Sequence, residues 1–391
     1  MIWIYAYSFF SKIAFERAVF LLFLSDRGLS GAQLGIAQTT LFASNFLFEL
    51  PSGFFSDRFG RRLAVTIGLT CLGVGALMTY LSSSFEAIVL IFILLGLGYA
   101  LISGADESLI YDRLKCDGRE SEYLYVTSRM LSIGAVALAC SMLIGGYLSE
   151  KSWFYVYSLT AAAMAMAAFC FWHVPSRSKA RQSQSTEKFD FQRATNEIYS
   201  FVNLSKSNGL LEMVLAIAIL EAVVTPYFVY AQKLFDQFAI SQGKIGVIYG
   251  VVELVSGIAV LATPILFSQI GLARMIYPAL VLTAGFISLN ILGNASFSIL
   301  AFLIFMVIAQ IVAASFNNFL HKRLPDCVRT TIISGYSFTR SAIVGVLYLT
   351  VGMLIESVGA TMAFSYLAIL PLISILLVSR AIYKGVLRDG M

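Results

Sequence analysis

Apolar stretches of roughly 20 residues recur along the whole chain, and each is long enough to cross a lipid bilayer as an α-helix. Of the 391 residues, 59% are hydrophobic and only 13% are charged. A water-facing domain usually carries about 25% charged residues, so part of this surface must face lipid. A membrane β-barrel would show shorter segments in which apolar and polar residues alternate, and the sequence lacks that pattern.

Polar clusters and turn-forming dipeptides divide the apolar sequence into twelve predicted membrane spans. We place them at residues 2–25, 31–55, 63–82, 86–112, 122–149, 153–173, 210–235, 243–268, 273–293, 296–321, 328–354 and 359–382. The expected fold class is an all-α membrane protein with twelve transmembrane helices in two pseudo-symmetric six-helix bundles. The N-terminal bundle is expected at 1–173 and the C-terminal bundle at 209–391.

Residues 174–208 form the only long connection between predicted spans, and we interpret them as a cytoplasmic linker. Helical spacing in its second half predicts an amphipathic helix on the membrane surface. The residues at this spacing are Phe191, Ala194, Ile198, Phe201 and Ser205. The first apolar stretch carries Lys12, Glu16 and Arg17, so we interpret it as a membrane span and not as a cleaved signal peptide.

Lysine and arginine gather in the connections that follow the even-numbered spans, including the linker, and in the C-terminal tail. The connections that follow the odd-numbered spans, on the other side of the membrane, hold only Arg27, Lys151, Lys233 and Lys244. The positive-inside rule then predicts a multi-pass protein of the cytoplasmic (inner) membrane with both termini in the cytoplasm. This distribution also explains the net charge of +5 without a nucleic-acid partner.

The two halves of the sequence contain an internal repeat, because one constant shift aligns several features of the second half with the first. The aligned positions are Gly60 with Gly271, Asp106-Glu107 with Asn317-Asn318, Arg129 with Arg340, and Gly134 with Gly345. Two parallel six-span repeats are an architecture of secondary transporters, in which the substrate path lies between the repeats.

A glycine- and arginine-rich motif, Gly53-Phe-Phe-Ser-Asp57-Arg58-Phe-Gly60-Arg61-Arg62, joins the second and third predicted spans. Together with the twelve spans and the repeat, it resembles the signature of the major facilitator superfamily. The resemblance covers the whole chain and favours a bacterial exporter-like branch. It implies that Gly53, Asp57, Arg58, Gly60, Arg61 and Arg62 form a cytoplasmic gate that latches the two halves. The alternative for Arg61 and Arg62 is a simple positive-inside anchor.

Two further motifs of that family are degraded in this sequence. Phe92 stands where many members have an arginine in the fourth span. The antiporter signature in the fifth span is reduced to Ser141-Met-Leu-Ile-Gly145-Gly146, which keeps the paired glycines and lacks the proline. The second-half counterpart of Asp57 is Ser268, so the latch is expected to be one-sided.

Ionisable side chains inside a span are costly and are candidates for function. Our candidates for proton coupling or the substrate cavity are Glu16, Arg17, Asp106, Glu107, Arg129, Glu221, Glu253 and Arg340, with the amides Asn317 and Asn318. We expect Arg129 to pair with Asp106 or Glu107, and one of these adjacent acids to retain a proton. The alternative is a structural network of salt bridges. By the resemblance, spans 1, 4, 7 and 10 line the cavity, which would expose Glu16, Arg17 and Glu221 to it.

These features predict a secondary transporter that moves a small organic compound by alternating access. We expect it to use the proton gradient, with no cofactor and no metal, and to act as a monomer that exports its substrate by proton antiport. One alternative is an uptake symporter or facilitator on the same fold. An alternative of another class is a membrane receptor or scaffold without transport. The sequence shows no catalytic triad, phosphate loop or metal-ligand spacing, so an enzyme is not expected.

Overall fold

The computed structural model describes residues 1–175, 209–270, 272–323 and 326–384. These residues form helices and no β-strand, as the apolar stretches predict. The predicted amphipathic helix in the linker lies outside the described residues. The helices before the linker are α1 (Ile2–Ser11), α2 (Phe20–Asp26), α3 (Gly31–Phe59), α4 (Arg61–Leu81), α5 (Phe85–Ile102), α6 (Ala105–Cys116), the 3-10 turn η1 (Glu120–Glu122), α7 (Tyr123–Lys151) and α8 (Trp153–Trp172).

The helices after the linker are α10 (Leu210–Gln237), α11 (Gln242–Ile270), α12 (Leu272–Ser288), the 3-10 turn η2 (Leu289–Leu292), α13 (Ala295–Arg323), α14 (Asp326–Val358), α15 (Ala360–Leu367) and α16 (Ile369–Tyr383). Most ends lie within a few residues of the predicted spans. Ten stretches of the described residues are long and apolar enough to cross a membrane. The broken first span and the more polar α3 bring the described segments to the predicted twelve.

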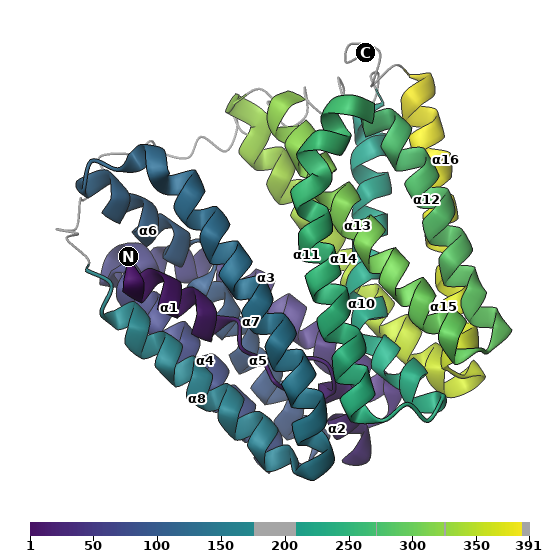
Figure 1. Cartoon of the computed structure of the whole chain (residues 1–391), viewed down its shortest axis with the longest axis horizontal. Coiled ribbons are helices and arrows are strands. Elements are labelled where there is room, and N and C mark those ends of the chain that lie inside the picture. Colours follow the sequence, from purple (N-terminus) through teal and green to yellow (C-terminus); the bar gives the residue numbers. More distant parts are fainter. Residues whose placement is uncertain (176–208, 271, 324–325, 385–391) are drawn as a thin grey trace. The chain divides into compact units, whose positions relative to one another are not determined.

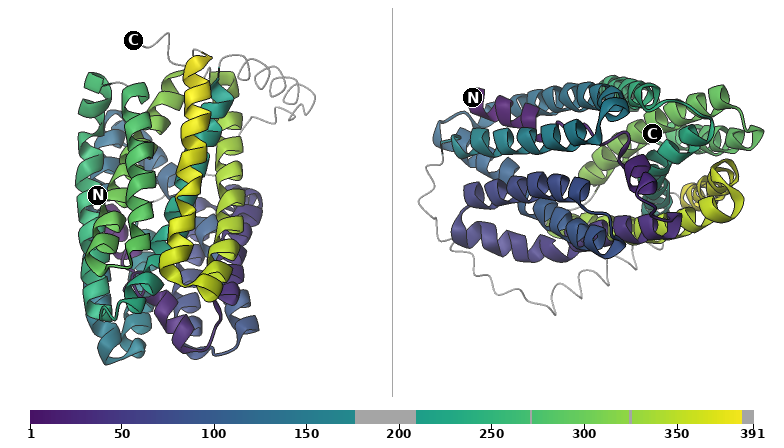
Figure 2. Two further views of the ribbon diagram at one scale, coloured as in Figure 1. Left: turned by 90° about the vertical axis from the view of Figure 1, so that its right-hand side faces the viewer. Right: turned by 90° about the horizontal axis from the view of Figure 1, so that it is seen from below.

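The chain divides into two compact units. Unit 1 comprises Met1–Gln182 together with Ala239–Leu254, the first half of α11 and the residues just before it. Unit 2 comprises Ser183–Phe238 and Val255–Met391. Helices of one unit run alongside one another as a bundle, which is clearest for α10, α12, α13 and α16 in Figure 2. The predicted bundle boundaries at 173 and 209 stay a prediction.

The first span is not the continuous helix that its hydropathy predicts. The backbone leaves helical geometry after Ser11 and regains it at Phe20, so the span consists of α1, a non-helical segment and α2 (Figure 1). We call residues 12–19 the first-span break. This segment contains neither glycine nor proline, so local propensity does not explain it. Its cause is tertiary and is described with the candidate site.

Two other spans are also interrupted, and here the local sequence supplies the reason. The fourth span breaks between α5 and α6 at Gly104, whose φ of +72° is a left-handed conformation that glycine adopts without strain. The last span breaks between α15 and α16, close to Pro371. Proline lacks the N–H that would continue the hydrogen-bond ladder at this point.

Helix α7 packs closely on two neighbours of unit 1 through its paired glycines. A Cβ atom at Gly145 would lie 1.8 Å from the carbonyl oxygen of Phe15 in the first-span break. A Cβ atom at Gly146 would lie 2.5 Å from the carbonyl oxygen of Gln242 and 2.8 Å from the Cα atom of Gly246, both on α11. Only glycine permits these approaches, so the surviving half of the degraded motif positions the break.

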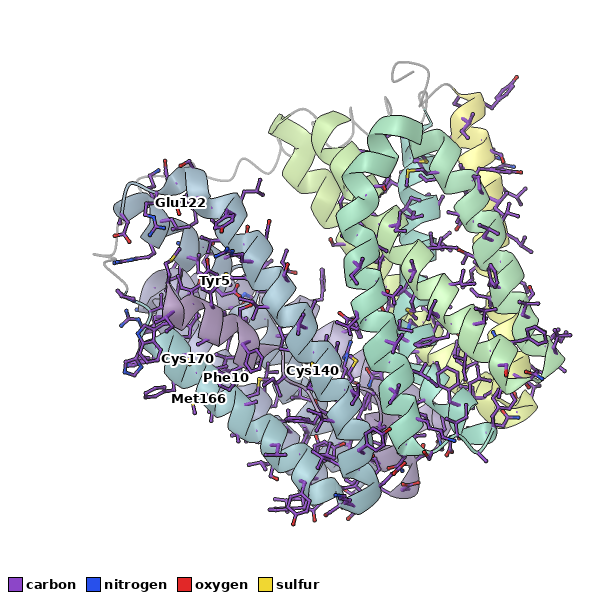
Figure 3. The ribbon with its side chains drawn as sticks, viewed as in Figure 1. Tyr5, Phe10, Glu122, Cys140, Met166 and Cys170 are labelled. Carbon is purple, nitrogen blue, oxygen red and sulfur yellow. The ribbon has the colours of Figure 1, made fainter. Side chains whose placement is uncertain are left out.

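Apolar packing holds α1 in place on the other side of the break. Phe10, on the last turn of α1, packs against the buried cluster that includes Ile4, Tyr7 and Cys170. Figure 3 labels Phe10 and Cys170, a residue of α8 that belongs to this cluster. The helical part of the span is therefore fixed before the chain enters the break.

Replacing Gly145 tests this packing. Gly145→Ala is expected to destabilise the fold by about 1–3 kcal/mol, because the added methyl group overlaps the Phe15 carbonyl and the backbone must shift. The measurement is the apparent midpoint of thermal unfolding in detergent. Gly285→Ala in α12 is the matched control, since a Cβ atom there meets nothing within 4 Å. Equal midpoints for the two variants would contradict the close approach.

Candidate functional site

The first-span break is held by side chains from two neighbouring helices. The amide N–H of Ala14 donates to Oγ of Ser141 on α7 at 3.1 Å. The amide N–H of Phe15 donates to Oγ1 of Thr160 on α8, also at 3.1 Å. Non-helical backbone within a membrane must be satisfied by protein groups or water. Ser141 and Thr160 supply these partners and explain why the helix can open here.

Thr160 also connects the break to an acid. The Thr160 hydroxyl donates to Oε2 of Glu16 at 2.5 Å. The hydroxyl oxygen, Oγ1 of Thr160, also accepts from the Phe15 amide. These two hydrogen bonds link the Glu16 carboxylate to the backbone of the break through one hydroxyl group. Thr160 itself is buried. A change in the charge of Glu16 would alter the hydrogen bond that holds Phe15.

Further charged and aromatic residues of unit 1 surround Glu16. Tyr99 on α5 interacts electrostatically with both Glu16 and Arg17. Glu253, in the first half of α11, interacts with Arg17 and Lys12. Of the predicted site residues, Glu16, Arg17 and Glu253 therefore belong to one group, which we call the break cluster. Ionisable residues within membrane spans are costly, which makes this group a candidate functional site.

Asp106 and Glu107 lie in the first turn of α6, directly after Gly104. The hydroxyl of Tyr7 donates to Oδ2 of Asp106 at 2.8 Å, and Oδ1 accepts from the Glu107 amide at 2.8 Å. A helix N-terminus stabilises negative charge. The N-terminus of α6 and the Tyr7 hydroxyl therefore stabilise the Asp106 carboxylate, and no arginine is required.

The expected pairing of Arg129 with these acids is wrong. Its guanidinium lies over the ring of Tyr125, 4.4 Å from the ring centroid. Among the described residues, no ion pair joins Arg129 to Asp106 or Glu107. The prediction assumed a continuous fourth span, whereas the break at Gly104 gives the two acids a helix N-terminus and Tyr7 as partners.

The glycine- and arginine-rich motif forms the connection between α3 and α4. Gly60 has a φ of +97°, which a side chain would strain, and it ends α3 one residue before α4 begins. Nη1 of Arg61 contacts Oδ2 of Asp112 on α6 at 2.5 Å. Arg62 donates to the carbonyl of Val174 after α8. Both arginines thus tie the connection to other parts of unit 1.

The remaining motif residues face outward. Asp57 and Gly53 are exposed, and the Arg58 guanidinium lies over the ring of Phe59. The role of Asp57 as a latch stays a prediction. Asp112 was not among the predicted site residues. Its position at the end of the predicted fourth span was the only sequence signal for it.

Unit 2 brings together Glu221 of α10 with Tyr336 and Arg340 of α14. Nη1 of Arg340 lies 4.0 Å from Oε2 of Glu221, with side-chain exposures of 38% and 12%. Tyr336 lies close enough to Glu221 to interact with its carboxylate. We call these three residues the unit 2 triad. Asn317 is exposed on α13, and the side chain of Asn318 lies outside the described residues.

Sequence reasoning found the acids and missed the hydroxyl groups that hold them. Ser141 and Thr160 look like ordinary small residues of apolar spans. Only the packing of α7 and α8 around the break gives them a role. The Ser141–Gly145 spacing places both on one face of α7, which is the single local signal that they act together.

Substitutions at Thr160 test how the break is held. Thr160→Val removes the donor to Glu16 and the acceptor for Phe15, which leaves buried polar groups without partners. The expected cost is about 1–3 kcal/mol for each unsatisfied group. The measurement is thermal unfolding in detergent, and Thr160→Ser, which keeps the hydroxyl, is expected to retain most of the stability. If Val and Ser behave alike, the hydrogen bonds do not hold the break.

Comparison with known proteins identifies transporters as relatives. The inner membrane transport protein YajR of Escherichia coli (strain K12) is 28% identical over 154 residues, covering 39% of this chain and 33% of that protein. The uncharacterized MFS-type transporter MJ1317 of Methanocaldococcus jannaschii is 33% identical over 106 residues, covering 27% of this chain and 25% of that protein. These alignments span a third or less of the relatives' length.

Solved structures and a family model extend the likeness to nearly the whole chain. A mutant of the nucleoside transporter NupG superposes with a TM-score of 0.80 at 16% identity, covering 98% of this chain and 99% of that one. A D-xylose-proton symporter superposes with a TM-score of 0.71 at 15% identity, covering 98% and 94%. At such identities the likeness shows the fold alone. The family model of the Major Facilitator Superfamily matches residues 2–349, and the chain therefore belongs to this superfamily of secondary transporters.

Proposed function

We propose that this transporter couples movement of a small organic compound to protons, and that Glu16 carries the coupled proton. The observation that carries the proposal is the hydrogen bond from Thr160 to Glu16 inside the first-span break. Discontinuous transmembrane helices commonly build the substrate and coupling-ion sites of transporters. Here the discontinuity contains the acid itself.

The geometry suggests how a proton at Glu16 would act on the fold. The Glu16 carboxylate accepts from Thr160, and Thr160 accepts from the Phe15 amide. A proton on Oε2 removes the need for the Thr160 donor, so the hydroxyl can turn and the backbone of the break can rearrange. The charge facing this acid is Arg17, which in turn interacts with Glu253, and the hydroxyls of Tyr99 on α5 and Tyr157 on α8 also interact with Glu16.

Competition between proton and substrate at this cluster would give exchange. A transporter that binds a proton only after releasing its substrate must move the two in opposite directions. We therefore favour antiport that drives efflux, in a monomer of the cytoplasmic membrane with both termini in the cytoplasm. No cofactor is needed, because the proton gradient supplies the energy.

Proton-coupled uptake on the same fold is the main alternative. One solved structure with this fold is that of a D-xylose-proton symporter, so the fold accommodates proton symport as well. Whole-cell accumulation distinguishes the two directions. Loss of an exporter raises the intracellular concentration of its substrate, whereas loss of an importer lowers it.

Reconstitution in proteoliposomes tests the coupling. An imposed gradient of one pH unit is expected to drive the unmodified protein to accumulate substrate up to about tenfold for each coupled proton, since such a gradient corresponds to about 1.4 kcal/mol per proton. Glu16→Gln is expected to abolish that accumulation while exchange of labelled for unlabelled substrate continues. The measurement is uptake of labelled solutes. The solutes are chosen as those whose intracellular concentration differs between cells with the transporter and cells from which its gene is deleted.

The control replaces an acid of the same type outside the break cluster. Glu86→Gln, at the exposed first turn of α5, is expected to keep the full response to the gradient. Transport that ignores the gradient, or a Glu16→Gln variant that still responds to it, would refute coupling through Glu16. Ligand binding without any movement across sealed vesicles would favour a receptor or scaffold.

A further inference from the structure

We infer that the unit 2 triad, Glu221, Tyr336 and Arg340, binds an amino-acid-sized zwitterion, a molecule that carries an ammonium and a carboxylate group a few bonds apart. This inference rests on the proposed transport function and names its substrate class. It uses residues of unit 2 alone and makes no use of the proton at Glu16.

Two buried polar atoms of the triad are poorly satisfied. Tyr336 lies beside the Glu221 carboxylate and interacts with it, but Oε1 of Glu221 and the hydroxyl of Tyr336 are enclosed and make no well-formed hydrogen bond among the described residues. Most buried polar atoms in folded proteins have a partner, so each exception calls for an explanation. A ligand that donates hydrogen bonds to Oε1 and to the tyrosine oxygen would satisfy both atoms.

The ion pair of the triad is open. Nη1 of Arg340 and Oε2 of Glu221 are 4.0 Å apart, beyond the 2.7–2.9 Å typical of a charge-assisted hydrogen bond. Another glutamate of α10 does form a close ion pair. Glu212 is in direct hydrogen-bond contact with Lys384, and the side-chain exposures of the two residues are 17% and 37%. The exposures in the triad are nearly the same, 12% and 38%, so burial does not explain the difference.

The internal repeat isolates the residue that makes the triad different. The shift that aligns Arg129 with Arg340 also aligns Tyr125 with Tyr336 and Phe10 with Glu221. In unit 1 the guanidinium of Arg129 lies over its tyrosine ring. In unit 2 the arginine lies near Glu221 instead. The repeat thus supplies the tyrosine and arginine, and Glu221 converts them into a site with one negative and one positive group.

The charges of the triad favour a zwitterion over a simple cation or anion. Arg340 is the more exposed partner, and its planar guanidinium fits a carboxylate with two hydrogen bonds. Glu221 lies deeper, beside Tyr336, where a ligand ammonium can donate to both. A cation alone would occupy Glu221 and leave Arg340 without a carboxylate, and an anion alone would do the reverse. A compact zwitterion satisfies both groups at once.

A binding assay with matched probes tests this inference. The purified protein in detergent is titrated with each of the twenty proteinogenic L-amino acids, and thermal unfolding reports binding. At least one amino acid is expected to raise the unfolding midpoint. Its decarboxylated amine and its deaminated acid are expected to bind roughly tenfold more weakly or worse, since each leaves one charged group of the triad without its partner. No stabilisation by any amino acid, or equal stabilisation by the amine, would overturn the inference.

Variants assign the binding to the triad. Glu221→Gln and Arg340→Gln are each expected to reduce affinity for the best amino acid about tenfold or more. Glu212→Gln, which changes the same charge on the same helix, is expected to leave affinity unchanged. Size-exclusion profiles exclude misfolded variants, and Arg340→Lys offers a second measurement if Arg340→Gln does not fold, with weakened binding expected because the bidentate contact is lost. Full affinity in the folded variants would refute the site.

The outcome is separable from that of the proton-coupling experiment. Zwitterion binding that depends on Glu221, together with transport that ignores the pH gradient, would support this site and refute the proposed coupling. Gradient-driven transport of a solute without such binding would do the opposite. The Glu16→Gln variant is expected to keep the binding, because Glu16 belongs to unit 1 and not to the triad.

Discussion

The constraint on which this structure depends is that a polypeptide within a membrane must satisfy its own backbone hydrogen bonds. A helix does so automatically, and most spans of this chain obey that rule. The first span departs from it, and two hydroxyl groups compensate: Ser141 accepts from Ala14 and Thr160 accepts from Phe15. The break persists because other helices provide what the helical ladder no longer provides.

Close packing is the second requirement of the break, and it gives the degraded fifth-span motif a structural meaning. A side chain at position 145 would occupy the place of the Phe15 carbonyl oxygen. The paired glycines therefore have separate tasks, since Gly145 faces the break and Gly146 faces α11. The sequence retains the part of the motif that permits close approach of backbones and lacks the proline that would bend the helix. Small residues at helix contacts are the usual solution in membranes.

The sequence predicts the spans well because hydropathy measures what the bilayer selects, and helix ends such as Gly60 carry local signals. It predicts which acids lie inside the membrane for the same reason. It does not predict the break, since residues 12–19 are ordinary helix formers whose conformation is decided by Ser141, Gly145 and Thr160 far along the chain. It also misassigned Arg129, because pairing was inferred from depth alone and the helix start at Gly104 changed what Asp106 needs.

The internal repeat shows how one architecture can carry different chemistry in its two halves. Both halves keep a tyrosine four residues before an arginine, Tyr125 with Arg129 and Tyr336 with Arg340. In unit 1 the guanidinium lies over the tyrosine ring, a cation over a π-face. In unit 2 Glu221 of α10 places a carboxylate beside the pair, so the arginine meets an opposite charge and the tyrosine hydroxyl becomes one more polar group that needs a partner. The same spacing of tyrosine and arginine thus takes part in a cation–π contact in one half and in a polar site in the other.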